Sequence, residues 1–385
     1  MPSFDTLPPQ AGSILNTIPS LIEKTFPIPG RFRGSLPSNI AELSRLLTGA
    51  RGDRSLSYLS RPNLLSAYLY YFLPWNLFRL CRLLSNLDIP LRAEDTIIDL
   101  GCGPLTFVCA LWIARPDLRG IPLEFFCVDR SAPALEAGKK FFSAIDAESP
   151  WKINLVREDI NIRRSVTRKK KAALVCAVNM FNEIYENLSH NNTEGLKRMA
   201  AEIARTMNCY ASTSALVLTV EPGVPQSGHF ISFLRAAFLE TGRPPISPCP
   251  HTQACPLSGE KKRWCHFAFE TSGVPGELHR LSAAAGIPKE RLVFSFLLAG
   301  TQEASSQKTR KLKTEHEKTR IISDAFPLHD GSYGRYGCCS RGLILLTGEK
   351  KLIDKTFSGS LITPVFDADK QRDAKSGALL ARLAQ

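Results

Sequence analysis

Short apolar runs rich in β-forming residues alternate with helical stretches along the central part of the chain, and this alternation limits the possible folds most. The runs lie at 96–101, 123–130, 152–159, 172–179 and 214–223. The helical stretches between them lie at 104–115, 132–146, 194–207 and 228–240. Such spacing is typical of βαβ units and predicts an α/β fold with a parallel sheet covered on both faces. Further strands are expected at 291–300 and 341–348.

The remaining segments suggest a division of the chain. A proline-rich stretch at 1–35 is expected to form an extended arm, and apolar spacing predicts a helical N-terminal segment at 36–90. The expected order then continues with an α/β domain at 91–245, a cysteine-rich loop at 246–270, a part at 271–350 that completes the sheet and the site of that loop, and a tail at 351–385.

The chain is basic, which bears on its partner rather than on its fold. It has 49 Lys and Arg against 36 Asp and Glu, a formal net charge of +13. A charge of this sign favours an anionic partner, most often nucleic acid. Two basic runs, at 163–171 and 308–320, have the density needed to neutralise phosphates, although each run alone is typical of a solvated loop.

The N-terminal sequence and the cysteine content indicate the cellular compartment of the protein. The first residues lack a secretory pattern, and Arg31 is the first arginine, which argues against a transit peptide. The longest apolar stretch, 64–85, is broken by Pro74 and charged residues, so no membrane span or membrane partner is expected. Eleven cysteines without an export signal argue against a disulfide framework. We expect a monomer in a reducing bacterial cytoplasm rather than in a mitochondrial matrix.

A glycine loop follows the first expected strand. In "DLGCGP", at 99–104, Gly101 and Gly103 allow a tight turn and a close approach to a ligand. Asp99 precedes the loop, and Asp129 ends the second strand, where an acidic residue accepts hydrogen bonds from ribose hydroxyls. A dinucleotide site would prefer a third glycine where Thr106 stands, which argues against NAD. The alternative to ligand binding is that Asp99 caps the following helix.

The stretch "IIDLGCGPLT", at 97–106, resembles motif I of class I S-adenosylmethionine-dependent methyltransferases. The resemblance implies a Rossmann-like methyltransferase sheet. It places Asp99, Gly101 and Gly103 around the methionine and ribose part of S-adenosylmethionine, with Asp129 on the ribose. Asp159 matches an acidic position that faces the adenine amine, although it could equally begin a turn.

Methyl transfer requires alignment of the acceptor and, where needed, removal of its proton. Asn179, Asn182 and Glu183 follow the fourth strand, where such enzymes place acceptor-facing residues, although they could equally be helix caps or first-turn acids. The Asn/Asp-Pro-Pro-aromatic motif of N6-adenine enzymes is missing from this stretch. No residue stands out as a general base, so catalysis is inferred from the fold.

The stretch "SPCPHTQACPLSGEKKRWCHF", at 247–267, concentrates three cysteines, and "GCCSRG" at 337–342 adds a fourth. Their spacing does not fit the knuckles of zinc sites, whereas Cys-Pro pairs occur in iron–sulfur loops. His251 and His266 could ligate zinc instead. The alternative to a metal site is a loop of unpaired thiols packed under Trp264 and Phe267.

The segments "VEPGVPQSGHFISFLR", "SPCPHTQACPL…WCHF" and "RYGCCSRG" together resemble the methyltransferase-like proteins of the mitochondrial small ribosomal subunit and their bacterial relatives. The resemblance covers about residues 55–345. It implies an iron–sulfur (4Fe-4S) cluster and action on assembling small subunits. The implied ligands are Cys249, Cys255, Cys265 and either Cys338 or Cys339.

Three functions follow as hypotheses. The first is an S-adenosylmethionine-dependent methyltransferase that acts on small-subunit ribosomal RNA and carries an iron–sulfur cluster. The second is a non-catalytic small-subunit assembly factor that binds ribosomal RNA through the same fold. The third is a zinc-dependent RNA-binding protein. The glycine loop favours the first, and the missing acceptor motif favours the second.

Overall fold

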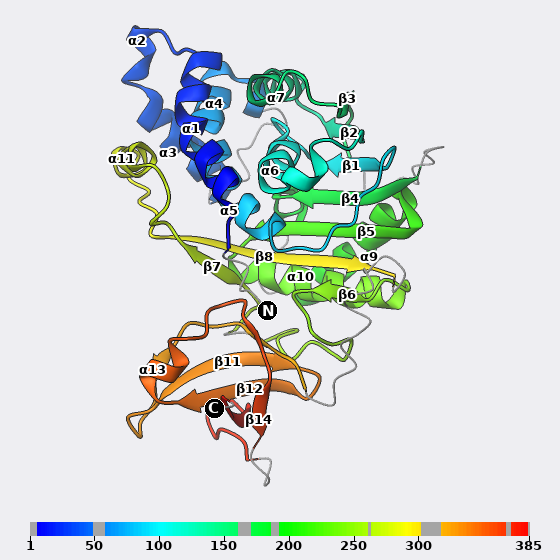
Figure 1. Ribbon diagram of the computed structural model, residues 1–385, viewed down its shortest axis with the longest axis vertical. Coiled ribbons are helices and arrows are strands. Elements are labelled where there is room, and N and C mark those ends of the chain that lie inside the picture. Colours follow the sequence, from blue (N-terminus) through cyan, green and yellow to red (C-terminus); the bar gives the residue numbers. More distant parts are fainter. Residues whose placement is uncertain are drawn as a thin grey trace.

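The computed structural model describes residues 6–48, 58–160, 171–185, 192–260, 263–301, 317–366 and 371–383. A helical N-terminal layer lies beside a central sheet that has helices on both faces, and a second, smaller sheet lies beyond the central sheet along the long axis (Figure 1). Within the described residues, no helix is both long enough and apolar enough to cross a membrane. The first basic run except Lys171, and residues 308–316 of the second run, lie outside the described residues.

The first sheet has eight strands in the order β3-β2-β1-β4-β5-β8-β6, with β7 paired to β8. Their bounds are β1 Thr96–Leu100, β2 Glu124–Asp129, β3 Lys152–Arg157, β4 Ala172–Val178, β5 Ala211–Pro222, β6 Pro245–Ser247, β7 Phe267–Glu270 and β8 Arg291–Gly300. Neighbouring strands among β1–β5 are parallel, whereas β8 runs antiparallel to β5. The expected α/β, Rossmann-like sheet is therefore confirmed.

Alternate residues of the central strands supply two cores, because successive side chains of a strand point to opposite faces. Ile97 belongs to the core under α5 (Leu73–Leu84), α6 (Thr106–Ala114) and α7 (Ala132–Ile145). Its neighbour Ile98 belongs to the core under α9 (Thr193–Tyr210) and α10 (Pro225–Glu240). The helices expected between the strands are thus present, and they cover both faces of the sheet (Figure 1).

The expectation of an extended arm at 1–35 is wrong. Residues Pro9–Thr25 form α1, and its Leu15, Ile18 and Ile22 are buried on one face against the core under α5 and α6. A three- to four-residue apolar period outweighs the prolines, one of which lies in the first turn, where no backbone donor is needed. The layer continues through α2 Gly30–Arg33, α3 Leu36–Thr48, a 3₁₀ turn Tyr58–Ser60, α4 Pro62–Ala67 and a π-helical turn Tyr68–Phe72.

The expectation of a tail at 351–385 is also wrong, because this segment contributes three strands to a second sheet. That sheet has seven strands in the order β13-β9-β11-β12-β15-β14, with β10 paired to β11. Its strands are β9 Thr319–Ile321, β10 Phe326–Pro327, β11 Tyr333–Cys339, β12 Gly342–Gly348, β13 Leu361–Ile362, β14 Pro364–Phe366 and β15 Leu379–Leu383. The strand expected at 341–348 is β12, which belongs to this second sheet. Within 271–350, only β8 completes the first sheet.

The short helices α8 Asn182–Tyr185, α11 Gly276–Ala284 and α13 Lys350–Ile353 and the 3₁₀ turn Pro116–Leu118 complete the described elements. Contacts across the two sheets come from the second sheet's first strands and from the loop between β6 and β7. Arg320 of β9 donates a hydrogen bond of 2.8 Å to the carbonyl of Pro248 in that loop. Arg291 of β8 forms an ion pair with Asp324. The cysteine-rich loop therefore lies at the junction of the two sheets.

Candidate functional site

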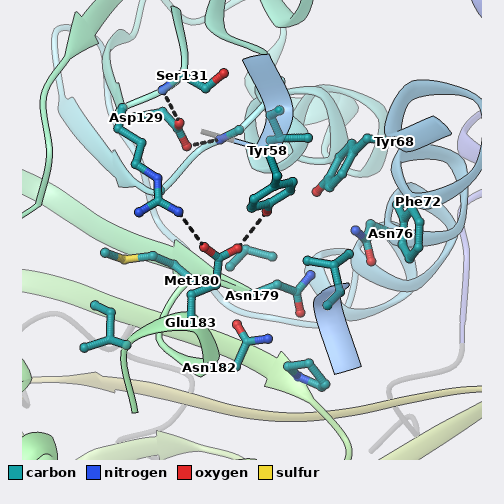
Figure 2. Close-up of a pocket in the computed structure, with 18 of the residues that line it drawn as sticks. Tyr58, Tyr68, Phe72, Asn76, Asp129, Ser131, Asn179, Met180, Asn182 and Glu183 are labelled. Carbon is teal, nitrogen blue, oxygen red and sulfur yellow. Dashed lines mark hydrogen bonds and ion pairs between the residues drawn. The ribbon is translucent and has the colours of Figure 1, made fainter. Parts of the chain in front are cut away.

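A cavity of about 310 Å³ opens at the carboxyl ends of β1, β2 and β4. Strand β1 lies between β2 and β4, so the strand order of the sheet reverses at this point. Open α/β sheets bind ligands at such a reversal. Its walls come from the glycine loop, the ends of β2 and β3, the β4–α8 loop and the N-terminal helical layer (Figure 2).

The glycine loop takes a conformation that side chains disfavour. Gly101 has φ +65° and Gly103 has φ +52°, the left-handed region where glycine carries no penalty. A Cβ at Gly101 would lie 2.3 Å from the Met180 side chain, so this glycine also allows the β4–α8 loop to pack against β1. A Cβ at Gly103 would meet no atom within 4 Å, so Gly103 borders open space.

Asp129 ties the second strand to the glycine loop. Its Oδ2 accepts a hydrogen bond of 2.9 Å from the Gly103 amide, and its Oδ1 accepts one of 2.8 Å from the Ser131 amide (Figure 2). Burial raises the pKa of this carboxyl, and the two amides oppose the rise. Asp129 lines the cavity with its remaining lone pairs available, as a ribose-binding carboxylate requires.

The other two expected acids differ in position. Asp159 lines the cavity at the end of β3, and its neighbour Glu158, which the sequence analysis did not single out, lines it too. Asp99 does not line the cavity, because it lies beneath the glycine loop with 1% of its surface exposed. Its Oδ1 lies 3.5 Å from the Cys176 Sγ, and its Oδ2 has no partner among the described residues. Burial raises the pKa of Asp99 to about 8.

The three candidates after β4 meet in the same cavity. Asn179 takes φ +53°, and its Oδ1 accepts a hydrogen bond of 3.3 Å from Arg79 of α5. Glu183 accepts one hydrogen bond of 2.7 Å from the Tyr58 hydroxyl and one of 3.2 Å from Arg130 (Figure 2). Asn182 keeps its buried Oδ1 without a partner among the described residues.

A residue that the sequence analysis missed holds this loop in place. Glu221, at the end of β5, is fully buried, and its two oxygens accept hydrogen bonds from the Phe181 and Asn182 amides at 2.9 and 3.1 Å. Burial raises the pKa of Glu221 to about 8. The signal that could have identified it is an acidic residue directly after the apolar run "ALVLTV".

The N-terminal layer supplies the rest of the walls, which the sequence did not predict. Tyr58, Tyr68, Phe72 and Asn76 line the cavity opposite the β4–α8 loop (Figure 2). Burial raises the pKa of Tyr68 to about 12, so its phenol stays protonated. Two aromatic positions, Tyr68 and Phe72, come from the π-helical turn, a feature that is frequent at functional sites.

The expected metal ligands come from two separate segments. Cys249, Cys255 and Cys265 lie on the loop between β6 and β7, and Cys338 lies on β11. Burial raises the pKa of Cys265 and of Cys338, and the nearby thiols of Cys249 and Cys255 raise both further. Hence tertiary structure brings these four thiols into one neighbourhood, although no group of three or more His, Cys, Asp or Glu side chains in the described ranges is arranged to hold a metal ion.

The two adjacent cysteines of β11 face opposite ways. Cys338 Sγ lies 3.2 Å from the Nε2 of His251 in the cysteine loop. Cys339 is fully buried in the small core of the second sheet with Ile344 and Leu379. The period of two along a strand therefore points Cys338 toward the cysteine loop and Cys339 away from it.

Two buried arginines surround the cysteine loop. Arg235 of α10 donates a hydrogen bond of 3.2 Å to the Cys249 Sγ and further bonds to the carbonyls of His251 and Gln253. Arg320 of β9 is 8% exposed, and burial lowers its pKa to about 10, with Cys249 and Cys265 opposing the decrease. Positive charges at buried thiols favour the thiolate form that binds metals.

Several solved structures resemble the chain at low similarity. A protein described as a class I S-adenosylmethionine-dependent methyltransferase from Listeria monocytogenes is 10% identical, with 77% of this chain and 88% of that chain covered, at a TM-score of 0.35. Methyltransferases from Geobacter sulfurreducens and Thiobacillus denitrificans, both in complex with S-adenosyl-L-homocysteine, are 10% and 12% identical. The match to the Geobacter sulfurreducens protein covers 68% of this chain and 98% of that chain, at a TM-score of 0.33. The match to the Thiobacillus denitrificans protein covers 71% of this chain and 99% of that chain, at a TM-score of 0.34.

Likeness at these TM-scores carries no weight for the fold, which follows instead from the strand order of the first sheet. A sequence search found no match among curated proteins. A family model, described as "Mitochondrial small ribosomal subunit Rsm22", matches residues 65–326, which is about two thirds of the chain. The match includes every strand of the first sheet and the cysteine loop. The chain therefore belongs to the family of the mitochondrial small ribosomal subunit protein Rsm22.

Proposed function

We propose that this protein is an S-adenosylmethionine-dependent methyltransferase that acts on ribosomal RNA of the assembling small subunit. The observation that carries the proposal is the link from Asp129 to the glycine loop at a cavity whose other half holds Asn179, Asn182 and Glu183. Family membership supports the small subunit as the partner. The family description speaks of mitochondria, whereas the sequence analysis expects a bacterial cytoplasm, and the proposed chemistry is the same in either.

The residues present fit S-adenosylmethionine. Gly103 borders open space that a Cβ would partly fill, and Asp129 presents carboxylate oxygens next to it. Asp129 would bind the ribose hydroxyls, and Asp159 or Glu158 the adenine amine. When bound, S-adenosylmethionine supplies an electrophilic methyl group. The chain's own task is to hold an acceptor in line with it, and the unpartnered Asn182 Oδ1 is suited to accept a hydrogen bond from an acceptor amine.

Titration calorimetry with S-adenosylhomocysteine tests the cofactor site. Wild-type protein should bind it, and Asp129→Asn should bind at least about tenfold more weakly, because a charge-assisted acceptor of about 1.5–3 kcal/mol is lost. Glu136→Gln, an exposed carboxyl on α7, is the matched control and should leave binding unchanged. Absence of binding at millimolar ligand would reject the methyltransferase proposal.

A specific observation favours the second candidate, a non-catalytic assembly factor. Glu183, the one carboxylate among the three candidates after β4, is already engaged by Tyr58 and Arg130. A general base in the acceptor half is then hard to assign. Mapping methyl groups on small-subunit RNA from a deletion strain separates the two: immature subunits with every methyl group retained would support the assembly factor.

We also propose that Cys249, Cys255, Cys265 and Cys338 hold an iron–sulfur cluster, with zinc as the alternative metal. The donor set supports this, since four thiols and two buried arginines meet where two chain segments converge. Arg235 and Arg320 would balance the negative charge of a thiolate-ligated cluster. Anaerobic purification followed by iron, sulfide and zinc analysis tests it; colourless protein with stoichiometric zinc would instead favour the zinc-dependent RNA-binding protein.

A further inference from the structure

Acids and cations line different parts of the cavity, apart from Arg130 and Glu183, which pair with each other. Asp129, Glu158 and Asp159 line the end that we assign to the cofactor, whereas Arg79 and Lys289 line the acceptor half together with Asn179. Arg79 comes from α5, and Lys289 comes from the loop before β8. Neither cation forms an ion pair with any carboxylate that the structure describes.

The neighbouring acids leave these positive charges uncompensated. Glu221 is the acid that affects Arg79 electrostatically. Burial raises the pKa of Glu221 to about 8, and the Glu221 oxygens already accept hydrogen bonds from two backbone amides. Glu183 is bound by Tyr58 and Arg130. Burial and the proximity of Arg79 lower the pKa of Lys289 to about 8, so Lys289 is still mostly charged at neutral pH.

The two cations differ in how they can act. Arg79 donates to the Val293 carbonyl, Asn76 and Asn179, which fixes its guanidinium, and its buried Nε–H has no partner among the described residues. Lys289 has no hydrogen bond in the described structure, and its ammonium lies 5.7 Å from the centre of the Tyr71 ring. Lys289 is therefore the movable point charge, and Arg79 the fixed one.

We propose that Arg79 and Lys289 form an anion subsite that binds a backbone phosphate of single-stranded RNA, with the adjoining nucleotide entering the acceptor half. This inference rests on the proposed function and names the group that its acceptor site recognises. Tyr68 and Phe72 line the same cavity and offer aromatic surfaces, the usual platform for an unstacked base. The net charge of +13 favours a polyanionic partner, and the proposed action on ribosomal RNA makes RNA the source of the anion.

The test measures binding of a short single-stranded RNA of mixed sequence, with S-adenosylhomocysteine present, as a function of salt. Lys289→Gln should weaken binding about three- to tenfold and make the slope of log K against log salt shallower by about 0.7, since one phosphate contact is lost. Lys289→Arg should restore most of both values. Lys355→Gln, an exposed lysine in the turn after α13, is the matched control and should change neither.

The outcomes separate this inference from the proposed function. Affinity for S-adenosylhomocysteine should be equal in all four proteins, because Lys289 lies in the other half of the cavity. If that ligand binds but Lys289→Gln retains the wild-type RNA affinity and salt slope, the subsite is refuted while the cofactor site stands. Stronger competition by a polyglutamate peptide than by RNA, lost in Lys289→Gln, would overturn the assignment to RNA.

Discussion

Two buried carboxyl groups, those of Asp99 and Glu221, lie beneath the cavity. Asp99 and Glu221 are at most 1% exposed, and burial raises the pKa of each to about 8. Glu221 holds two amides of the β4–α8 loop, and Asp99 lies under the glycine loop next to Cys176. Glu221 therefore shapes the backbone around the site, Asp99 lies buried beneath it, and neither acid lines the cavity.

These raised pKa values make stability depend on pH. The pKa of Asp99 rises from its ordinary 3.8 to about 8, so the folded state keeps a proton that the unfolded chain releases. The contribution is fully present below about pH 4 and is lost as pH rises toward 8. Relative to Asp99→Asn, wild type should lose at least about 1.4 kcal/mol of unfolding free energy over this range, the equivalent of one pKa unit.

Urea unfolding at several pH values measures this difference. The Asn variant lacks the titrating group, so the gap between the two proteins should change steadily in its favour as pH rises. Glu136→Gln, whose carboxyl is exposed, should follow the wild-type curve. Parallel curves for wild type and Asp99→Asn would mean that Asp99 is not held protonated.

At the scale of elements, the N-terminal layer closes the cavity through few polar contacts. The Tyr58 hydroxyl donates to Glu183 of α8, and Arg130 after β2 donates to the same carboxylate. Three segments far apart in the sequence thus meet at one side chain (Figure 2).

Tyr58→Phe should loosen this closure. The ring keeps its packing while one hydrogen bond to a charged group is lost, which costs about 1–3 kcal/mol. We expect faster hydrogen exchange in Tyr58–Ser60 and α4, with the exchange of β1 and β4 unchanged. Tyr70→Phe removes a hydroxyl that donates to the Phe26 carbonyl, away from the cavity, and serves as the matched control. Equal exchange in both variants would contradict the closure.

Strand β11 offers a matched pair of variants for the proposed metal site, since its adjacent cysteines face opposite sides. If the cluster is present, Cys338→Ser should abolish bound iron and the visible absorption of the cluster, because it removes one of the proposed thiolate ligands. Cys339→Ala should keep both and lower only the stability of the second sheet's core. Iron content and absorption spectra after anaerobic purification give the answer, and loss of iron in Cys339→Ala alone would reverse the assignment.

At the scale of the whole molecule, the second sheet is attached where the proposed metal ligands converge. Arg320 bonds the Pro248 carbonyl, and Cys338 contacts His251, so β9 and β11 both meet the cysteine loop. Three of the proposed ligands belong to the first domain's loop and one to the second sheet. A bound metal would therefore join the two sheets.

Removal of the metal should loosen that junction. After chelation we expect hydrogen exchange to increase in β9, β11 and the loop between β6 and β7. Strands β1, β4 and β5 should keep their protection, because they pair with one another in the middle of the first sheet. Equal exchange with and without chelator would contradict a joining role. Cys338→Ser without chelator should reproduce the change, and Cys339→Ala should not.

The sequence by itself determined the elements whose signals are local. Strand–helix alternation predicted β1–β5 and their helices, and the positions of Gly101, Gly103 and Asp129 predicted the glycine loop, because backbone conformation there depends on the residues themselves. Local spacing gave wrong predictions at the two ends of the chain. The prolines of 1–35 suggested an extended arm where α1 lies, and the strands of the second sheet after residue 350 are too short to give a clear pattern.

Only the tertiary structure decided which distant residues share a site. It brought Tyr58, Arg79 and Lys289 to one cavity, set Glu221 behind the β4–α8 loop and directed Cys338 rather than Cys339 toward the cysteine loop. These relations depend on how helices and sheets pack, and the spacing of residues along a chain does not encode that. The glycine loop and the residues after β4 that line the cavity were thus readable from local sequence. The opposite walls were not, because they come from segments more than two hundred residues apart, such as Tyr58 and Lys289.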